Sequence, residues 1–137
     1  DLELVKQKTM DNPVYYVQYA HARICSLNKK AAEAGKSAAP VTPESLALLN
    51  TQWDMEILRL LDQYPDYVEA AAHAQSPHMI SMYLQELAST LHRYYTNCHV
   101  LSAEDDVAAA RLMLLDCVAG VVKNGLGLLG VNAPESM

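Results

Sequence analysis

Apolar residues recur at helical spacing through most of this chain, and that pattern constrains its fold more than any other feature. In four stretches they lie three or four residues apart, and no stretch alternates as a half-buried strand would. The stripes are Val17, Ala20, Ile24 and Leu27; Leu46, Leu49, Trp53, Ile57, Leu60 and Leu61; Ile80, Tyr83, Leu84, Leu87 and Leu91; and Leu112, Leu115, Val118, Val122 and Leu126. The sequence therefore predicts an all-α fold, a single helical bundle.

Local start and stop signals divide this pattern into five helices. Asn12 followed by Pro13 is typical of a helix start, because Asn caps free N–H groups and Pro fits the first helical position. Pro65 is expected to end one helix and open a short one, since proline cannot donate the helical hydrogen bond. Ser102 and Asp105 have the spacing of a capping box. The helices are predicted over about residues 12–34, 43–63, 65–74, 77–97 and 103–129.

The size and the cysteines of the chain indicate one reduced, cytoplasmic domain of 137 residues. Cys25, Cys98 and Cys117 are odd in number and lack metal-ligand spacing. Asp116 and Lys123 interrupt the most apolar stretch, so no membrane span is predicted. The sequence opens Asp-Leu-Glu-Leu without an initiator methionine, and we expect it to be a piece of a longer protein.

The formal net charge of −6 argues against a general polyanion binder, but the charge is unevenly spread. Residues 44–69 hold six acids and one base, which makes that region a poor surface for RNA. Residues 15–36 hold one acid and five bases, counting a protonated His21. Of the two regions, only the second is suited to RNA.

Two tyrosines and an arginine form a stripe of their own on the first predicted helix. At about 100° per residue, Tyr16, Tyr19 and Arg23 fall within about 60° of one another and border the apolar stripe without entering it. Aromatic faces beside a cation suit an unstacked base and its phosphate. Tyrosine at the edge of a bundle is also commonly a packing residue whose hydroxyl stays in water. Helix geometry alone leaves both interpretations open.

The segment DNPVYYVQYAHARICS, which begins at Asp11, resembles a motif of arginyl-tRNA synthetases. In that family it marks the passage from the catalytic domain into the C-terminal, DALR-type anticodon-binding domain. Three later segments resemble the same family in the same order: ELASTLHRYYTNCHVL, AAARLMLLDCVAGVVKNGLGLLGV and the closing APESM. The resemblance covers nearly the whole chain, and its first and last motifs are the most specific.

The resemblance implies a set of RNA-contacting residues. The family's spacing Tyr-x2-Tyr-x3-Arg falls on the tyrosine and arginine stripe, and its C-terminal methionine contact falls on Met137. A further contact, aromatic in some members, falls on His99, where imidazole is a departure. One of Tyr94 and Tyr95 is expected to face RNA, and the sequence does not decide which. The predicted RNA-binding residues are Tyr16, Tyr19, Arg23, Met137, His99 and Tyr95.

The resemblance also implies the domain division and the partners. Residues 1–11 would end a connection from a catalytic domain, and residues 12–137 would form the anticodon-binding bundle. The expected partners are the anticodon loop of arginine tRNA and the catalytic domain of the same chain, with no DNA and no membrane. The parent enzyme would charge tRNA with arginine, using ATP with magnesium. The present chain lacks the family's catalytic motifs and any glycine-rich phosphate loop, so no cofactor and no catalytic residue are predicted in it.

The sequence leaves two alternatives to RNA binding. His21 and Cys25 lie four residues apart, a spacing that can hold zinc on a helix, but no second ligand pair is visible and no metal site is predicted. An acidic helical protein-interaction module without RNA binding is the second alternative, and the net charge of −6 is its best support. Such a module would be expected to expose an apolar patch.

Overall fold

The computed structural model describes residues 11–137, and helix is the only regular secondary structure in that range. The helices are α2 (Pro13–Glu33), α3 (Pro43–Ala47), α4 (Gln52–Ala74), α5 (Pro77–Asn97) and α6 (Asp105–Leu128). The prediction of an all-α bundle is therefore confirmed. Residues 1–10, nearly all of the predicted connection to a catalytic domain, lie outside the described residues, and the domain division stays a prediction.

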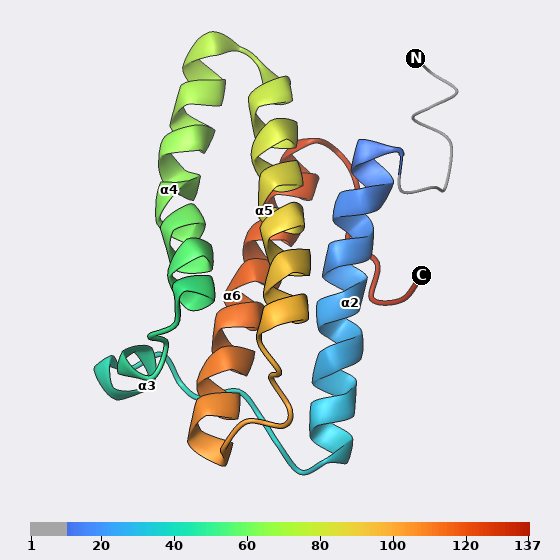
Figure 1. Cartoon of the computed structure of the whole chain (residues 1–137). Coiled ribbons are helices and arrows are strands. Elements are labelled where there is room, and N and C mark those ends of the chain that lie inside the picture. The colour runs from blue at the N-terminus through green and yellow to red at the C-terminus, as the bar shows by residue number, and fades with distance from the viewer. Residues whose placement is uncertain (1–10) are drawn as a thin grey trace.

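Four long helices lie side by side in the bundle (Figure 1). Helices α4 and α5 form an antiparallel hairpin, and α2 packs against both α5 and α6. The short α3 packs against α6 at one end. After α6 the chain turns back, and its last residues run beside α2 (Figure 1). The first and last described segments thus share one side of the molecule.

The predicted limits of α2 and α5 are confirmed, and each helix begins at a proline. The Asn12 side chain accepts a hydrogen bond of 3.0 Å from the backbone N–H of Val14, and Pro13 occupies the first helical position. The capping box predicted at Ser102 is wrong. Helix α6 begins after Glu104, which makes no side-chain cap bond. The first turn of α6 instead carries acids, which the positive end of the helix dipole favours.

The single helix predicted over residues 43–63 is wrong, because a capping box formed by Thr51 and Asp54 starts a new helix within that range. Thr51 Oγ1 accepts from the N–H of Asp54 at 3.1 Å, and Asp54 Oδ2 accepts from the N–H of Thr51 at 3.1 Å. This reciprocal pair starts α4 at Gln52, after α3 has ended at Ala47. Leu46, predicted to be buried, is therefore 41% exposed on the short α3.

The helix break predicted at Pro65 is also wrong, since α4 runs through it. The rings of Tyr64 and Tyr67, on either side of the proline, pack against Tyr83 with centroids 5.3 Å and 5.0 Å away. The Tyr83 hydroxyl donates to the carbonyl oxygen of Leu60, one turn earlier. Packing against α5 thus holds both sides of the proline in one helix, and it outweighs the local preference.

The apolar stripes predicted for α5 and α6 form the centre of the core. Every residue of both stripes is buried, with 4% exposure or less. Gly125 lets α6 approach α5 closely, because a Cβ placed there would lie 2.7 Å from Leu84 Cδ2. Within residues 11–137, no helix is long and apolar enough to cross a bilayer.

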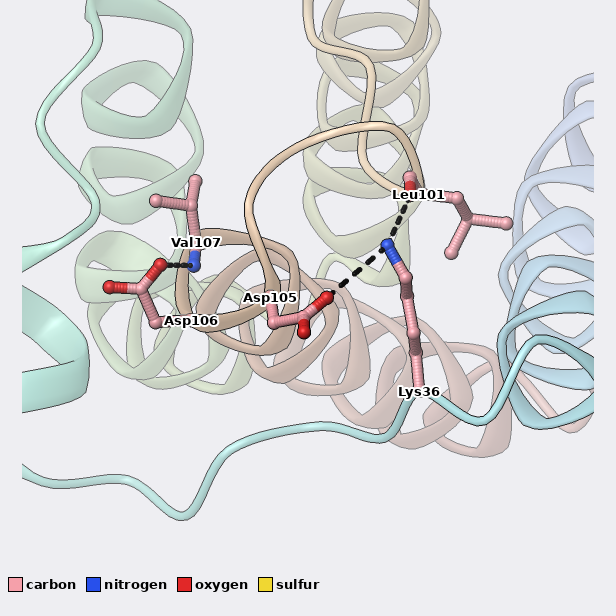
Figure 2. Close-up of polar contacts among 5 residues, drawn as sticks. All are labelled: Lys36, Leu101, Asp105, Asp106 and Val107. Carbon is pink, nitrogen blue, oxygen red and sulfur yellow. Dashed lines mark hydrogen bonds and ion pairs between the residues drawn. The ribbon is translucent and has the colours of Figure 1, made fainter.

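The segment between α2 and α3 is held against the start of α6. The Lys36 ammonium donates to the carbonyl oxygen of Leu101 and lies 3.8 Å from Asp105 Oδ1 (Figure 2). In the first turn of α6, the Val107 N–H donates to Asp106 Oδ1 at 2.8 Å (Figure 2). Asp105 is almost fully exposed, so its ion pair adds little stability. Of the two contacts of Lys36, the partly buried hydrogen bond to the Leu101 carbonyl is the firmer one.

Candidate nucleic-acid interface

Two side chains of α2 hold the C-terminal residues against the helix. Gln18 Nε2 donates to the backbone oxygen of Asn132 at 2.9 Å and to its side-chain oxygen at 3.2 Å. One turn further on, His21 Nδ1 lies 3.0 Å from the carbonyl oxygen of Pro134. A carbonyl oxygen only accepts, so Nδ1 carries the hydrogen of this bond. These contacts bring Met137 next to the exposed side of α2.

Three shallow cavities follow one another along α2 and form what we call the α2 groove. The first has a volume of about 250 Å³, and the C-terminal residues make one of its walls. The second, about 320 Å³, and the third, about 340 Å³, continue toward the end of α2. The first is lined by Tyr19, Ala22, Arg23, Ser26, Glu135, Ser136 and Met137; the second by Tyr19, Arg23, Ser26, Leu27, Lys30 and Tyr95; the third by Leu27, Lys30, Tyr95, Cys98, His99, Val100, Leu101 and Ser102.

Five of the six predicted RNA-binding residues line this groove, and the sixth lies behind it. Tyr19, Arg23 and Met137 meet in the first cavity, although Met137 is more than 100 residues away in the sequence. Tyr95 lines the second and third cavities, and His99 lies only in the third. Tyr16 lines none of the three; it is half-buried and packs against the core. Whether these residues contact RNA stays a prediction.

The choice between the two neighbouring tyrosines of α5 is resolved by burial. Tyr94 is 1% exposed, and its hydroxyl donates to Asp54 Oδ1 at 2.6 Å, so it belongs to the core. Tyr95 is half-buried and faces the groove. Its hydroxyl oxygen is buried, and burial raises the pKa of this phenol, although Arg23 opposes the shift. Tyr95 therefore offers the groove a neutral ring.

Arg23 occupies the centre of the groove and has two contacts on α5. Its guanidinium carbon lies 4.5 Å from the centroid of the Tyr95 ring, a cation–π distance. Its Nη1 lies 3.0 Å from Nδ1 of His92. The rings of Tyr16 and Tyr19 also pack against His92, with centroids 5.2 Å and 6.0 Å away. The tyrosine and arginine stripe predicted from helix geometry is thus assembled around one imidazole.

Sequence reasoning missed His92. Its segment, ELASTLHRYYTNCHVL, resembles the synthetase family, but nothing local distinguishes this histidine from the others. Its importance comes from the packing of α5 on α2, which joins residues 69 positions apart. His92 could have been found only by working out which face of α5 packs against α2. Burial lowers the pKa of His92 below its usual value, and the Arg23 guanidinium lowers it further.

The pair considered as a zinc site has other contacts. Cys25 Sγ lies 3.8 Å from His21 Nδ1, the same nitrogen that donates to the carbonyl of Pro134. Burial raises the pKa of the Cys25 thiol, as do Glu135 and Asp116. A raised pKa disfavours the thiolate that zinc requires. Across residues 11–137, no three His, Cys, Asp or Glu side chains gather into a set that could hold a metal ion.

Solved structures share this fold. A structure assigned as an arginyl-tRNA synthetase from Campylobacter jejuni matches the whole chain, with a TM-score of 0.77, 26% identity and 29% of its own chain covered. The Thermus thermophilus arginyl-tRNA synthetase matches 89% of the chain, with a TM-score of 0.66, 33% identity and 21% of its own chain covered. The bundle is therefore of the kind found in arginyl-tRNA synthetases.

The family follows from the sequence comparison. The profile described as DALR anticodon binding domain matches residues 17–137, and this chain belongs to that family. The chain is 62% identical over 138 residues to an arginine–tRNA ligase of Solidesulfovibrio magneticus and 44% identical over 137 residues to that of Carboxydothermus hydrogenoformans. Both matches cover all of this chain but only 25% of the relative. The resemblance described from the sequence is thus confirmed.

Proposed function

We propose that this chain is the anticodon-reading part of an arginine–tRNA ligase and that the α2 groove holds the anticodon loop of arginine tRNA. One observation carries the proposal. Tyr19 and Arg23 from α2 and Met137 from the end of the sequence converge on a single cavity. Family membership supports the proposal, since the resemblance implies an RNA contact at each of these three positions.

The first and second cavities of the groove offer different chemistry. The first cavity combines the ring of Tyr19 with the polarizable thioether of Met137, and Glu135 lies on its rim. A carboxylate there disfavours a phosphate, so this end is suited to an unstacked base. The second cavity is lined by Arg23 and Lys30 and by no acid, so the connecting phosphates belong there. An extended loop could place a base in the first cavity and its backbone along the second.

The acidic balance of the chain limits what the groove does alone. Phosphate neutralisation supplies much of the affinity of RNA-binding proteins, and the net charge here is −6. The chain would therefore contribute choice between loops more than strength. Most phosphate contacts would come from the rest of the ligase, of which this chain spans about a quarter.

The remaining functions belong to the proposed parent enzyme. It would charge arginine tRNA in the cytoplasm, with ATP and magnesium bound by a catalytic domain outside this chain. The present chain would be inactive alone and would hold no cofactor or metal. DNA and membranes are not expected partners. Binding energy gained in the α2 groove would act at a distance, by holding the tRNA in place for chemistry elsewhere.

The alternative, a protein-interaction module without RNA binding, has weaker support. The net charge suits it. Yet the chain belongs to an anticodon-binding family, and its relatives over the full length of the chain are arginine–tRNA ligases. An acidic module would also have no need for Arg23 and Lys30 in one groove. RNA binding is the function that joins these observations.

The test is a titration of the chain, and of the full-length ligase, with two RNA stem-loops at low salt. One carries an arginine anticodon and the other a scrambled loop on the same stem. Arg23→Ala should lower the preference for the first loop about tenfold in the full-length protein, whereas Arg59→Ala should not. Arg59 is a matched control, because it is exposed on α4 and carries the same charge. Equal effects of the two substitutions would indicate a general charge effect and would refute the proposal that the α2 groove holds the anticodon loop.

A further inference from the structure

We propose that His92, in its neutral form, is a positioning residue that fixes Arg23 for recognition of the anticodon loop. The proposal rests on the function proposed above and adds to it a residue from α5. His92 would not itself touch RNA. It would act through the guanidinium, which it holds at a set place in the α2 groove.

The geometry requires a neutral imidazole. Arg23 Nη1 and His92 Nδ1 are 3.0 Å apart. A guanidinium has only donors, so Nδ1 must accept and the ring hydrogen must be on Nε2. A protonated imidazole has no acceptor and would repel the arginine. The contact is therefore a hydrogen bond in one protonation state of His92 and a repulsion in the other.

Two contacts together restrict a side chain that would otherwise move freely. Arg23 is exposed, and an exposed arginine samples many rotamers. The hydrogen bond to His92 holds one edge of its guanidinium, and the Tyr95 ring lies 4.5 Å under its carbon. The remaining N–H groups stay available to the groove. A group fixed before binding loses less entropy when its ligand arrives, and this favours the ligand that fits the fixed position.

His92 is itself held in place and lacks a negative partner. Tyr16 and Tyr19 pack their rings against it from α2, and it is half-buried on α5. Among the described residues, Arg23 is the one charge that shifts its pKa, and no carboxylate opposes that shift. Burial acts in the same direction. Acidification is therefore expected to break the contact with Arg23, at a pH below the usual histidine value near 6.5.

The experiment measures selectivity in the full-length ligase, as the ratio of its affinities for the arginine-anticodon and scrambled stem-loops, from about pH 8 to about pH 5. His92→Asn keeps an acceptor near the position of Nδ1, whereas His92→Phe keeps a ring and removes the acceptor. His78→Asn is the control, because His78 is exposed in the first turn of the same helix. Using a ratio removes the general gain in RNA affinity that protonation of other histidines brings.

We expect His92→Phe to lower selectivity about tenfold at about pH 8, the size expected for one hydrogen bond to a charged group. His92→Asn should retain selectivity at both ends of the pH range. The wild type and His78→Asn should lose it as the pH falls. Thermal unfolding followed by circular dichroism shows whether each variant folds. If His92→Phe does not fold, the pH profiles of the wild type and His92→Asn decide alone.

Two results would overturn the proposal: wild-type selectivity in a folded His92→Phe, or the same pH profile in the wild type and His92→Asn. Failure of the proposed function looks different. In that case the wild type would show no selectivity at any pH, and the role of His92 would fall with it. If the wild type is selective and the His92 substitutions do not change that selectivity, the proposed anticodon-reading function is supported and only the positioning role of His92 is rejected.

Discussion

The hydroxyl of Tyr94 donates a hydrogen bond of 2.6 Å to Oδ1 of Asp54, a carboxylate with no exposed surface. The other oxygen of that carboxylate accepts from Thr51 and caps the start of α4. One acid therefore joins the N-terminus of α4 to the C-terminal part of α5. Burial raises the pKa of Tyr94, and the bond to Asp54 raises it further, so the phenol remains a donor at neutral pH.

Replacing Tyr94 with phenylalanine should destabilise the chain. The substitution leaves the ring in place but removes a donor from a buried carboxylate, which costs about 1–3 kcal/mol. Urea unfolding followed by circular dichroism measures the loss. Tyr67→Phe is the control, because the Tyr67 ring packs on Tyr83 and would still do so. We expect it to change the free energy of unfolding by less than about 0.5 kcal/mol. Equal losses in the two variants would contradict this role for Tyr94.

Removing the Tyr19 ring should impair tRNA use selectively. A base stacked on an aromatic side chain contributes about 1–3 kcal/mol. Tyr19→Ala in the full-length ligase should therefore lower kcat/KM for tRNA by about tenfold or more. The KM values for ATP and arginine should change little, because the proposed sites for both substrates lie in a catalytic domain outside this chain. Steady-state aminoacylation with each substrate varied in turn gives all three values. A loss shared equally by all three would indicate misfolding instead.

Adding a methyl group at Gly125 should destabilise the contact between α5 and α6. The new Cβ would lie 2.7 Å from Leu84 Cδ2 and 2.9 Å from its Cδ1, and Leu84 is fully buried. Overpacking of this kind costs about 1–3 kcal/mol. At Gly127, two residues on in the same helix, a Cβ meets no atom within 4 Å.

The matched variant Gly127→Ala should therefore stabilise the chain by up to about 1 kcal/mol, because alanine favours the helix. The opposite signs of Gly125→Ala and Gly127→Ala are the prediction, and denaturant unfolding measures both. Destabilisation by both variants would show that helix flexibility in this segment, not close packing, requires glycine.

Replacing Pro65 with alanine should stabilise α4 by about 1 kcal/mol or more. The proline is exposed inside the helix and denies the carbonyl of Leu61 its helical donor. Alanine would restore that bond, and the tyrosine contacts on either side would not change. The midpoint of thermal unfolding should rise accordingly. A lower midpoint would mean that the proline favours the helix geometry in which Tyr64 and Tyr67 both contact Tyr83.

The parts of the fold that local chemistry decides could be predicted from the sequence. Asn12 and Pro13 start α2, and continuous apolar stripes define α5 and α6. Errors arose where contacts from elsewhere changed the outcome. Pro65 predicts a helix end, because the sequence does not show that the residues on either side of it pack against Tyr83. Leu46 has helical spacing with the stripe that follows, but the capping box at Thr51 separates them.

The candidate site divides in the same way. Helix geometry placed Tyr16, Tyr19 and Arg23 on one stripe, and the structure keeps them together around His92. It could not show that Tyr16 lies behind the groove, since that depends on how α5 packs. The proximity of Met137 to Arg23 was expected only from family resemblance. His92 could not have been chosen before α2 and α5 were docked.

The hydrogen bonds from Gln18 and His21 to the C-terminal residues span 114 and 113 positions of the sequence. Contacts so far apart form only after the segments between them have collapsed, since closing a long loop costs entropy that local contacts do not repay. A chain that is folding would therefore form its helices before the first cavity of the α2 groove is complete. A chain without residues 135–137 would keep its buried core and lack one wall of that cavity.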